Sequence, residues 1–250
     1  MKSINRILVF TFFLFFSIWE VKSQTIVNTY DLISPIDSIW GLNSELQGTF
    51  SAGNGVFTSI NSGIGIGRQF KTYETWLLGG FNYASESGNK IYSTGFFSAR
   101  LHYHLNKSDQ IHLFYQNQFN SALLINNRNL IGANYSNGIK TKQHAYKLAI
   151  GAFKENETYT DFSEMNLFRA NIIGSITTDI ADVDVHFIYY YQPAIKEFSD
   201  VRMLGELSLQ FPINDKLKFE IESALRYDSK PHLNLLPLDF SSLIGLIYSL

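Results

Sequence analysis

Residues 217–228 read LKFEIESALRYD, and this stretch decides the expected fold. Its apolar residues are Leu217, Phe219, Ile221, Leu225 and Tyr227, and they alternate with Lys218, Glu220, Glu222, Arg226 and Asp228. Because successive side chains of a strand point to opposite faces, one face is apolar and the other ionic. A Lys or Arg facing lipid near the bilayer centre costs about 2–4 kcal/mol. The pattern therefore predicts a membrane-spanning strand with lipid on one side and a polar lumen on the other.

The same alternation recurs along the chain from Trp40 onward. Many of these segments have about ten residues, enough to cross a bilayer when tilted, whereas sandwich strands usually have about five or six. The expected strands are Leu42–Phe50, Val56–Ile66, Tyr73–Tyr83, Ile91–Leu105, Ile111–Phe119, Leu123–Tyr135, Tyr146–Ala152, Phe168–Ile176, Val183–Tyr191, Met203–Phe211, Leu217–Asp228 and Ile244–Leu250. We expect an all-β fold, a single antiparallel transmembrane β-barrel of about twelve strands, over residues 40–250.

The chain ends on SSLIGLIYSL, without a polar tail. Ile244, Leu246, Tyr248 and Leu250 alternate with smaller residues, so they are expected to form the lipid face of the closing strand. An open sheet edge is not tolerated in hydrocarbon. We therefore expect this strand to pair with the first one.

Connection lengths differ between the two predicted ends of the barrel. Short polar connections are expected at Arg68–Thr72, Asn106–Asp109, Gly138–Lys142, Asp179–Asp182 and Asn214–Lys216, and long ones at Glu155–Met165, Pro193–Val201 and Ser229–Leu238. Outer-membrane barrels have short periplasmic turns and longer outer loops, so both chain ends are expected in the periplasm. Residues 154–161 are expected to be a solvated acidic loop. Aromatic residues near predicted strand ends, such as Trp40, Tyr135 and Tyr227, fit interfacial girdles.

The N-terminal residues 1–23 have the pattern of a signal peptide helix. Lys2 and Arg6 precede an apolar stretch from Ile7 to Trp19, and Ser23 lies before the expected cleavage site. The alternative, a retained anchor, is less favoured because a membrane helix needs about 20 apolar residues. Residues 24–39 are then expected to form a periplasmic segment before the barrel.

Composition excludes several classes of function. The formal net charge is -2 and the sequence pI is about 6.3, so nothing indicates nucleic-acid binding. The chain has no cysteine, which excludes disulfides, thiolate metal sites and a cysteine nucleophile. We expect no cofactor.

Strand parity places a set of charged and polar side chains on the predicted lumen face. They are Arg100, His102, His104, Arg128, Lys147, Arg169, Asp184, His186, Glu206, Lys218, Glu220, Glu222, Arg226 and Asp228. One interpretation is salt-bridged packing that holds the barrel in shape, because unpaired charges in a confined space are costly. The other is that rings of charge screen small solutes or ions in a narrow water path.

One glycine pattern and one histidine pattern each have a structural and a functional interpretation. Residues 63–67, GIGIG, resemble part of a nucleotide-binding loop, but no helix follows, so lumen-facing glycines that leave room for bulkier neighbours are expected. His102, His104 and His112 could together bind a transition metal, but the sequence offers no evident supporting carboxylate. We expect polar lumen lining and no metal.

A lipid hydrolase would need a serine beside a histidine and an orienting partner. Ser98 shares a face with Arg100 and His102, but no G-x-S-x-G pattern occurs. No catalytic residue is assigned, and a non-enzymatic protein is expected. A barrel-borne Ser and His site remains the alternative, and a soluble exported β-sandwich is a third and weaker one.

Three short patterns resemble a known family. They are Gly53-Asn54, Arg128-Asn129-Leu130-Ile131-Gly132 leading to Tyr135, and Arg226-Tyr227-Asp228-Ser229-Lys230-Pro231 followed by Asp239 and Gly245-Leu246-Ile247-Tyr248. From about Gly48 onward the chain resembles the salt-induced outer-membrane protein family, DUF481. Such proteins usually end on Phe, whereas this chain ends on Leu250. The resemblance implies a barrel, export and recognition by the barrel-assembly machinery, but no reaction.

These observations together predict a porin-like protein of the outer membrane of a Gram-negative bacterium. We expect a narrow passive channel or a structural envelope protein linked to osmotic or salt stress. The expected partners are outer-membrane lipids, the barrel-assembly machinery and small solutes or ions.

Overall fold

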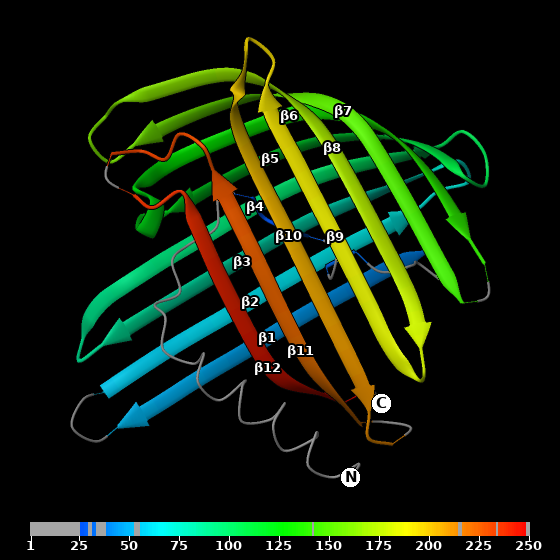
Figure 1. Cartoon of the computed structure of the whole chain (residues 1–250), viewed down its shortest axis with the longest axis horizontal. Coiled ribbons are helices and arrows are strands. Elements are labelled where there is room, and N and C mark those ends of the chain that lie inside the picture. Colours follow the sequence, from blue (N-terminus) through cyan, green and yellow to red (C-terminus); the bar gives the residue numbers. More distant parts are fainter. Residues whose placement is uncertain are drawn as a thin grey trace, which may run out of the picture.

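A computed structural model describes residues 26–29, 32–33, 39–52, 56–141, 143–214, 217–233 and 235–248. The described chain forms one twelve-stranded sheet in the order β1 to β12, in which each strand pairs antiparallel with the next (Figure 1). This confirms the all-β, up-and-down fold expected from the alternating sequence. No helix of the described residues is long and apolar enough to cross a membrane.

The strands are long, as the sequence pattern predicts for this fold. They are β1 (Trp40–Ala52), β2 (Val56–Gln69), β3 (Tyr73–Glu86), β4 (Asn89–His104), β5 (Asp109–Asn120), β6 (Ile125–Lys140), β7 (His144–Tyr159), β8 (Glu164–Ile180), β9 (Val183–Ala194), β10 (Glu197–Pro212), β11 (Leu217–Asp228) and β12 (Leu238–Tyr248). One short 3₁₀ turn, η1 (Ser121–Leu123), lies between β5 and β6, and the side chain of Asn120 accepts hydrogen bonds from the backbone amides of Ala122 and Leu123.

Two of the three predicted long loops are wrong. β7 continues to Tyr159 and β10 begins at Glu197, so the β7–β8 connection is residues 160–163 and the β9–β10 connection is residues 195–196. The charged residues assigned to solvated loops instead continue the alternation of the strands and find partners inside the sheet. Only the connection after β11, residues 229–237, is as long as expected. We call the end with these connections the loop end and the opposite end, where β2 turns into β3, the turn end.

The expected ladder between the first and last strands is not present in the described residues. The described ladders run from β1–β2 to β11–β12, and none joins β12 to β1. Figure 1 shows the sheet curling so that β10 to β12 pass in front of β1 to β3, with β1 and β12 running in different directions. Ladder hydrogen bonds require two strands that run alongside each other, and the described parts of β1 and β12 do not.

The register gives the sheet one apolar and one polar face. Outward side chains such as Leu77, Ile131 and Ile150 are exposed large hydrophobics, and Ile244 of β12 is one of them. Arg226 lies opposite Asp239 on the inward face of the same pair of strands. Leu250 of the predicted closing face lies outside the described residues. The alternation of the sequence is therefore converted into an outer apolar surface and an inner polar one.

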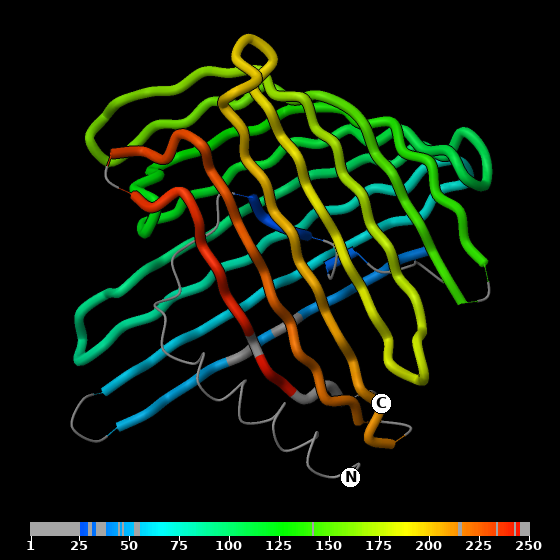
Figure 2. Tube along the Cα trace, in the orientation of Figure 1, coloured from blue at the N-terminus to red at the C-terminus, as the bar shows by residue number. Residues whose placement is uncertain are grey.

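The described N-terminal residues lie inside the curled sheet, where Figure 2 shows them in dark blue. Ile26 packs in a buried cluster with Leu204 and Ala224, and Leu32 packs with Trp76 and Leu78. The sequence predicts a periplasmic segment over residues 24–39, and these contacts put its described part against the inner wall. The predicted signal peptide, residues 1–23, lies outside the described residues.

Candidate functional site

Five charged side chains from four strands meet inside the sheet near its loop end. We call Arg128 of β6, Glu155 and Glu157 of β7, Arg169 of β8 and Arg202 of β10 the arginine–glutamate cluster. Each side chain is between 0% and 3% exposed. Charged groups this deeply buried are stable only when each is paired and hydrogen-bonded, so their contacts define the site.

Glu155 is the centre of the cluster. Its Oε2 accepts a hydrogen bond from Arg169 Nε at 2.6 Å, and its Oε1 accepts one from Arg202 Nη1 at 2.6 Å. Arg128 Nε also donates to Oε1, at 2.6 Å. One carboxylate therefore links three arginines from three different strands.

Glu157, two residues nearer the loop end, connects to two of these arginines, Arg128 and Arg202. Arg202 donates from Nη1 to Oε1 at 2.7 Å and from Nη2 to Oε2 at 3.0 Å, which is a two-point contact. Arg128 Nε lies 2.8 Å from Glu157 Oε1. The Tyr159 hydroxyl donates to Glu157 Oε2 at 2.5 Å. Both oxygens of this carboxylate are thus used.

Two further carboxylates lie at the edges of the cluster. Arg169 Nη1 lies 2.9 Å from Asp200 Oδ1, and Arg202 Nε donates to Asp228 Oδ2 at 2.9 Å. Three arginines thus face four carboxylates, so every arginine of the cluster has more than one acidic partner.

Strand register explains why the cluster forms. Arg128 lies directly opposite Glu157 in the β6–β7 ladder, and Arg202 lies directly opposite Asp228 in the β10–β11 ladder. Oppositely charged residues at facing positions of one sheet face stabilise that pairing. The curl of the sheet then brings Arg202 of β10 against Glu155 and Glu157 of β7.

The turn end of the same wall is different. Lys218 Nζ donates to Asp184 Oδ2 at 2.6 Å, yet these side chains are 35% and 47% exposed. Glu220 accepts hydrogen bonds from Ser208 at 2.9 Å and Gln210 at 3.1 Å, and it is only half-buried. The inward face from β7 to β11 is therefore packed at the loop end and open to water at the turn end.

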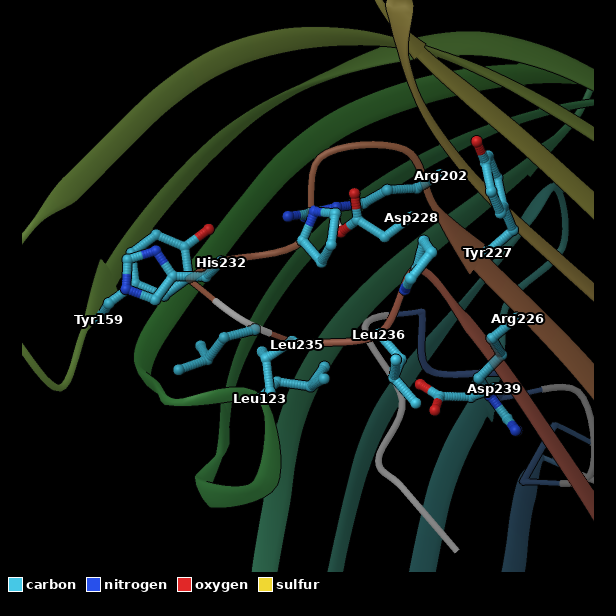
Figure 3. A pocket seen from close by; sticks show the side chains of 13 residues that line it. Leu123, Tyr159, Arg202, Arg226, Tyr227, Asp228, His232, Leu235, Leu236 and Asp239 are labelled. Atoms are coloured by element: carbon cyan, nitrogen blue, oxygen red, sulfur yellow. Dashed lines mark hydrogen bonds and ion pairs between the residues drawn. The ribbon is translucent and has the colours of Figure 1, made fainter.

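The long connection after β11 covers the loop end. The His232 ring stacks on the Tyr159 ring with centroids 3.8 Å apart, and His232 Nε2 lies 3.1 Å from Asp161 Oδ2. Beneath this loop is a small pocket whose lining includes Arg202, Asp228 and Leu235 (Figure 3). Hydrogen bonds from Ser163 and the neighbouring His232 hold the pKa of the exposed Asp161 carboxyl below its usual value.

A second polar group joins β3 to β6 near the turn end. His102 Nδ1 lies 2.9 Å from Glu74 Oε1, and the His102 and His112 rings have centroids 4.1 Å apart. His112 Nε2 is hydrogen-bonded to Ser136 Oγ at 2.7 Å. Glu74 is thus a supporting carboxylate that sequence parity did not identify. In the described part of the chain, no group of three or more His, Asp or Glu could hold a metal ion.

The remaining predicted lumen residues make separate inward contacts. Arg226 Nη2 donates to Glu206 Oε1 at 3.2 Å, Arg100 Nε to Ser98 Oγ at 3.3 Å, and Lys147 Nζ to Gln110 Oε1 at 3.3 Å. His104 Nδ1 is hydrogen-bonded to Gln110, and His186 Nδ1 to Thr177. Glu222 faces inward opposite Leu243. Of the fourteen residues singled out by parity, only Arg128 and Arg169 belong to the arginine–glutamate cluster.

Three members of the cluster were missed by sequence reasoning. Glu155 and Glu157 fall in a stretch assigned to a solvated loop, and Arg202 follows another stretch assigned to a loop. A signal was present, because Glu155, Glu157 and Tyr159 share the parity of Lys147 along one uninterrupted strand. The signal becomes clear only when β7 is known to continue past Ala152.

Comparison with known proteins gives one matching family and several solved structures of similar fold. The family described as "Protein of unknown function, DUF481" matches residues 45–250. Among solved structures, "NanC porin structure in rhombohedral crystal form" is similar at 12% sequence identity with a TM-score of 0.49, covering 84% of this chain and 100% of the other. No curated protein matches the chain.

Proposed function

We propose, from the premise that the chain belongs to the DUF481 family, that the protein is a non-enzymatic, integral β-barrel of the Gram-negative outer membrane. In this proposal it is a structural envelope protein whose lumen is closed at rest. The expected partners are outer-membrane lipids and the barrel-assembly machinery. The family description leaves the role open, so the proposal rests on the geometry of the sheet.

The outer face of the sheet supports a membrane location. Large apolar side chains are exposed on strand after strand, among them Leu46, Leu113, Ile131, Ile150 and Phe168. A water-soluble protein rarely exposes a continuous apolar surface of this extent, and such surfaces mark contact with lipid or another protein. Because they alternate with inward polar residues, lipid is the partner that fits.

The observation that carries the closed, structural role is the burial of the arginine–glutamate cluster. Side chains beside a water column would be accessible to a water molecule, yet these five are at most 3% exposed. The cluster links β6, β7, β8 and β10 across the inside of the sheet, and Asp228 adds β11. An open, narrow channel is therefore less well supported than a packed barrel.

Salt stress also fits this chemistry. Exposed ion pairs are screened when the ionic strength rises, because the Debye length falls from about 10 Å at 0.1 M to about 3 Å at 1 M. Buried pairs are screened much less. A barrel stabilised from within by buried pairs would keep its shape in high salt.

The hydrolase alternative has one feature in its favour. His112 Nε2 and Ser136 Oγ lie 2.7 Å apart, the distance of a nucleophile and its base. Ser136 is 0% exposed, however, and Glu74 contacts His102 rather than His112. A substrate carbonyl cannot approach a serine that water does not reach, so we favour the absence of enzymatic activity.

The test is electrical recording from the refolded protein. The mature chain, residues 24–250, is inserted into a planar bilayer, and folding is checked by a shift in gel mobility on boiling. We expect a folded protein that conducts no measurable current in a salt gradient. Stepwise currents whose ion preference changes in Glu220→Gln would contradict the closed barrel and favour the channel.

A further inference from the structure

The described N-terminal residues contact two different walls on the inside of the sheet. We call its described residues, 26–29 and 32–33, the N-terminal strap. Ile26 is buried against Leu204 of β10 and Ala224 of β11, with Tyr190 of β9 packed beside them. Leu32, only a few residues later, is buried against β3. The two anchors thus hold the strap between walls that are far apart in strand order.

Asn28 anchors the strap through both ends of its amide. Its Nδ2 donates to Glu206 Oε2 at 2.5 Å, and its Oδ1 accepts a hydrogen bond from the Tyr190 hydroxyl at 3.2 Å. The other oxygen of Glu206 accepts from Arg226 Nη2. The wall therefore presents an acceptor, Glu206, and a donor, Tyr190, that together match one side-chain amide. This is a specific contact rather than general packing.

The opposite anchor depends on a glycine. The backbone carbonyl of Leu32 lies directly over Gly65, where a Cβ would collide with that carbonyl oxygen and approach Leu78 Cδ2 at 3.2 Å. Gly63 and Gly67 share the inward face of β2 with Gly65, opposite Gly80 and Trp76. Small residues on this wall thus leave the space in which the strap lies.

We propose that the strap is an internal plug and that the protein has a latent ion-conducting activity, which appears when the strap leaves its groove. This inference rests on the proposed function, because it requires a barrel that is closed at rest. The arginine–glutamate cluster fills the side of the lumen from β6 to β10, whereas the glycine-lined side at β2 and β3 is filled by the strap itself. Removing the strap leaves a path lined by small residues and by Glu206, Arg226 and Asp239.

The strap can leave without dismantling the sheet. Ile26, Thr29 and Leu32 are its buried side chains, Asn28 adds hydrogen bonds to Glu206 and Tyr190, and no ladder of the described residues includes the strap. The groove would accept an extended peptide with apolar residues at the positions of Ile26 and Leu32 and an amide between them.

The first experiment compares the full chain with a variant lacking residues 26–33, both exported and purified from membranes. Each is placed in a planar bilayer with potassium chloride as the probe. We expect silence from the full chain and discrete current steps from the deletion variant. A synthetic peptide of residues 24–33, added to the deletion variant, is expected to abolish most of the steps, whereas a scrambled peptide leaves them.

A point substitution keeps the test valid if the deletion variant does not fold. Gly65→Leu places a side chain where the Leu32 carbonyl lies and should expel the strap from an intact chain. Gly174→Leu is the matched control, because a Cβ at Gly174 meets nothing within 4 Å. We expect current steps from Gly65→Leu and none from Gly174→Leu, with both showing the gel shift of a folded barrel.

The outcomes separate this inference from the proposed function. Current through the full chain overturns the closed barrel and the plug together. If the full chain is silent, and the deletion variant and Gly65→Leu both fold but are also silent, the plug alone is overturned. Steps that the peptide of residues 24–33 does not reduce also overturn the plug, because they arise elsewhere.

Discussion

Two groups of ion pairs on the same inner wall have the same chemistry and very different surroundings. At the loop end, Arg202 holds Glu157 in a two-point contact and both side chains are buried. At the turn end, Lys218 holds Asp184 at 2.6 Å, but water reaches both of them. Distance alone therefore does not distinguish the two regions, and burial does.

The difference teaches that the two regions stabilise the protein in different ways. Attraction between charges is weak where water surrounds them and becomes strong where the local dielectric constant is low. Burial also removes the hydration of each charge, so a buried group whose partner is lost becomes very unfavourable. The loop end is thus held by a network that tolerates no missing member, and the turn end by pairs that can open.

The largest expected effect is the loss of the central carboxylate. Glu155→Gln keeps the size of the side chain but leaves Arg128, Arg169 and Arg202 without their shared charge. We expect the free energy of unfolding to fall by about 3–5 kcal/mol, as when one partner of a buried pair is removed. The matched variant Asp184→Asn should lower it by less than about 1 kcal/mol. Urea unfolding in detergent micelles measures both.

Equal effects of Glu155→Gln and Asp184→Asn would break the comparison, because they would mean that water reaches the cluster in solution. As a control, both variants should unfold in a single cooperative transition, which shows that each starts from a native fold.

The sheet was predictable because its determinants are local. Alternating residues such as Leu217, Lys218, Phe219 and Glu220 reveal strand, face and direction without knowledge of any distant contact. The positions of all twelve strands follow from this pattern, apart from their ends.

The cluster was not predictable to the same degree because its determinants are not local. A run such as Lys154-Glu155-Asn156-Glu157 reads as a solvated loop unless the arginines that pair with it are known. Those arginines come from β6, β8 and β10, and the curl of the sheet brings them together. The strap was missed for the same reason, because its anchors on β2, β3, β10 and β11 are contacts between distant parts of the chain.

The second prediction concerns pairwise coupling. A double-mutant cycle with Arg202→Met and Glu157→Gln should give a coupling energy of about 2–3 kcal/mol, since both groups are in one network. The same cycle with Lys218→Met and Asp184→Asn should give about 0.5 kcal/mol or less. Raising the salt concentration to about 1 M should remove the second coupling and leave most of the first. If high salt removes both coupling energies, the two pairs do not differ in burial as the structure indicates.

The third prediction tests whether burial acts in the same way where no full ion pair exists. Ser136→Ala removes the buried partner of His112 Nε2. We expect a loss of about 1 kcal/mol in the free energy of unfolding, the usual net value of a hydrogen bond with its desolvated partner left behind. Ser62→Ala, which removes an exposed hydroxyl contact to the Phe81 carbonyl, is the control and should change almost nothing. A loss as large as that of Glu155→Gln would mean that a single neutral hydrogen bond matters as much as the buried charges, and would contradict the comparison.

The smallest expected effect is the release of the loop over the cluster at low pH. The pKa of Asp161 is lowered in the folded protein, mainly by its hydrogen bonds from Ser163. Its contribution to holding His232 is therefore complete at neutral pH and is lost as the pH falls through that lowered pKa. Protonated Asp161 no longer attracts the His232 ring, and residues 229–237 should then exchange their amide hydrogens faster, by a few fold after correction for intrinsic rates. Hydrogen exchange followed by mass spectrometry, in a pH series descending from pH 6, measures this. Asp161→Asn should show the faster exchange over the whole series, because the charge is absent throughout. If wild-type exchange in this loop has no such pH dependence, the stack of His232 on Tyr159 holds the loop without the carboxylate, and the packed end is closed by ring contact alone.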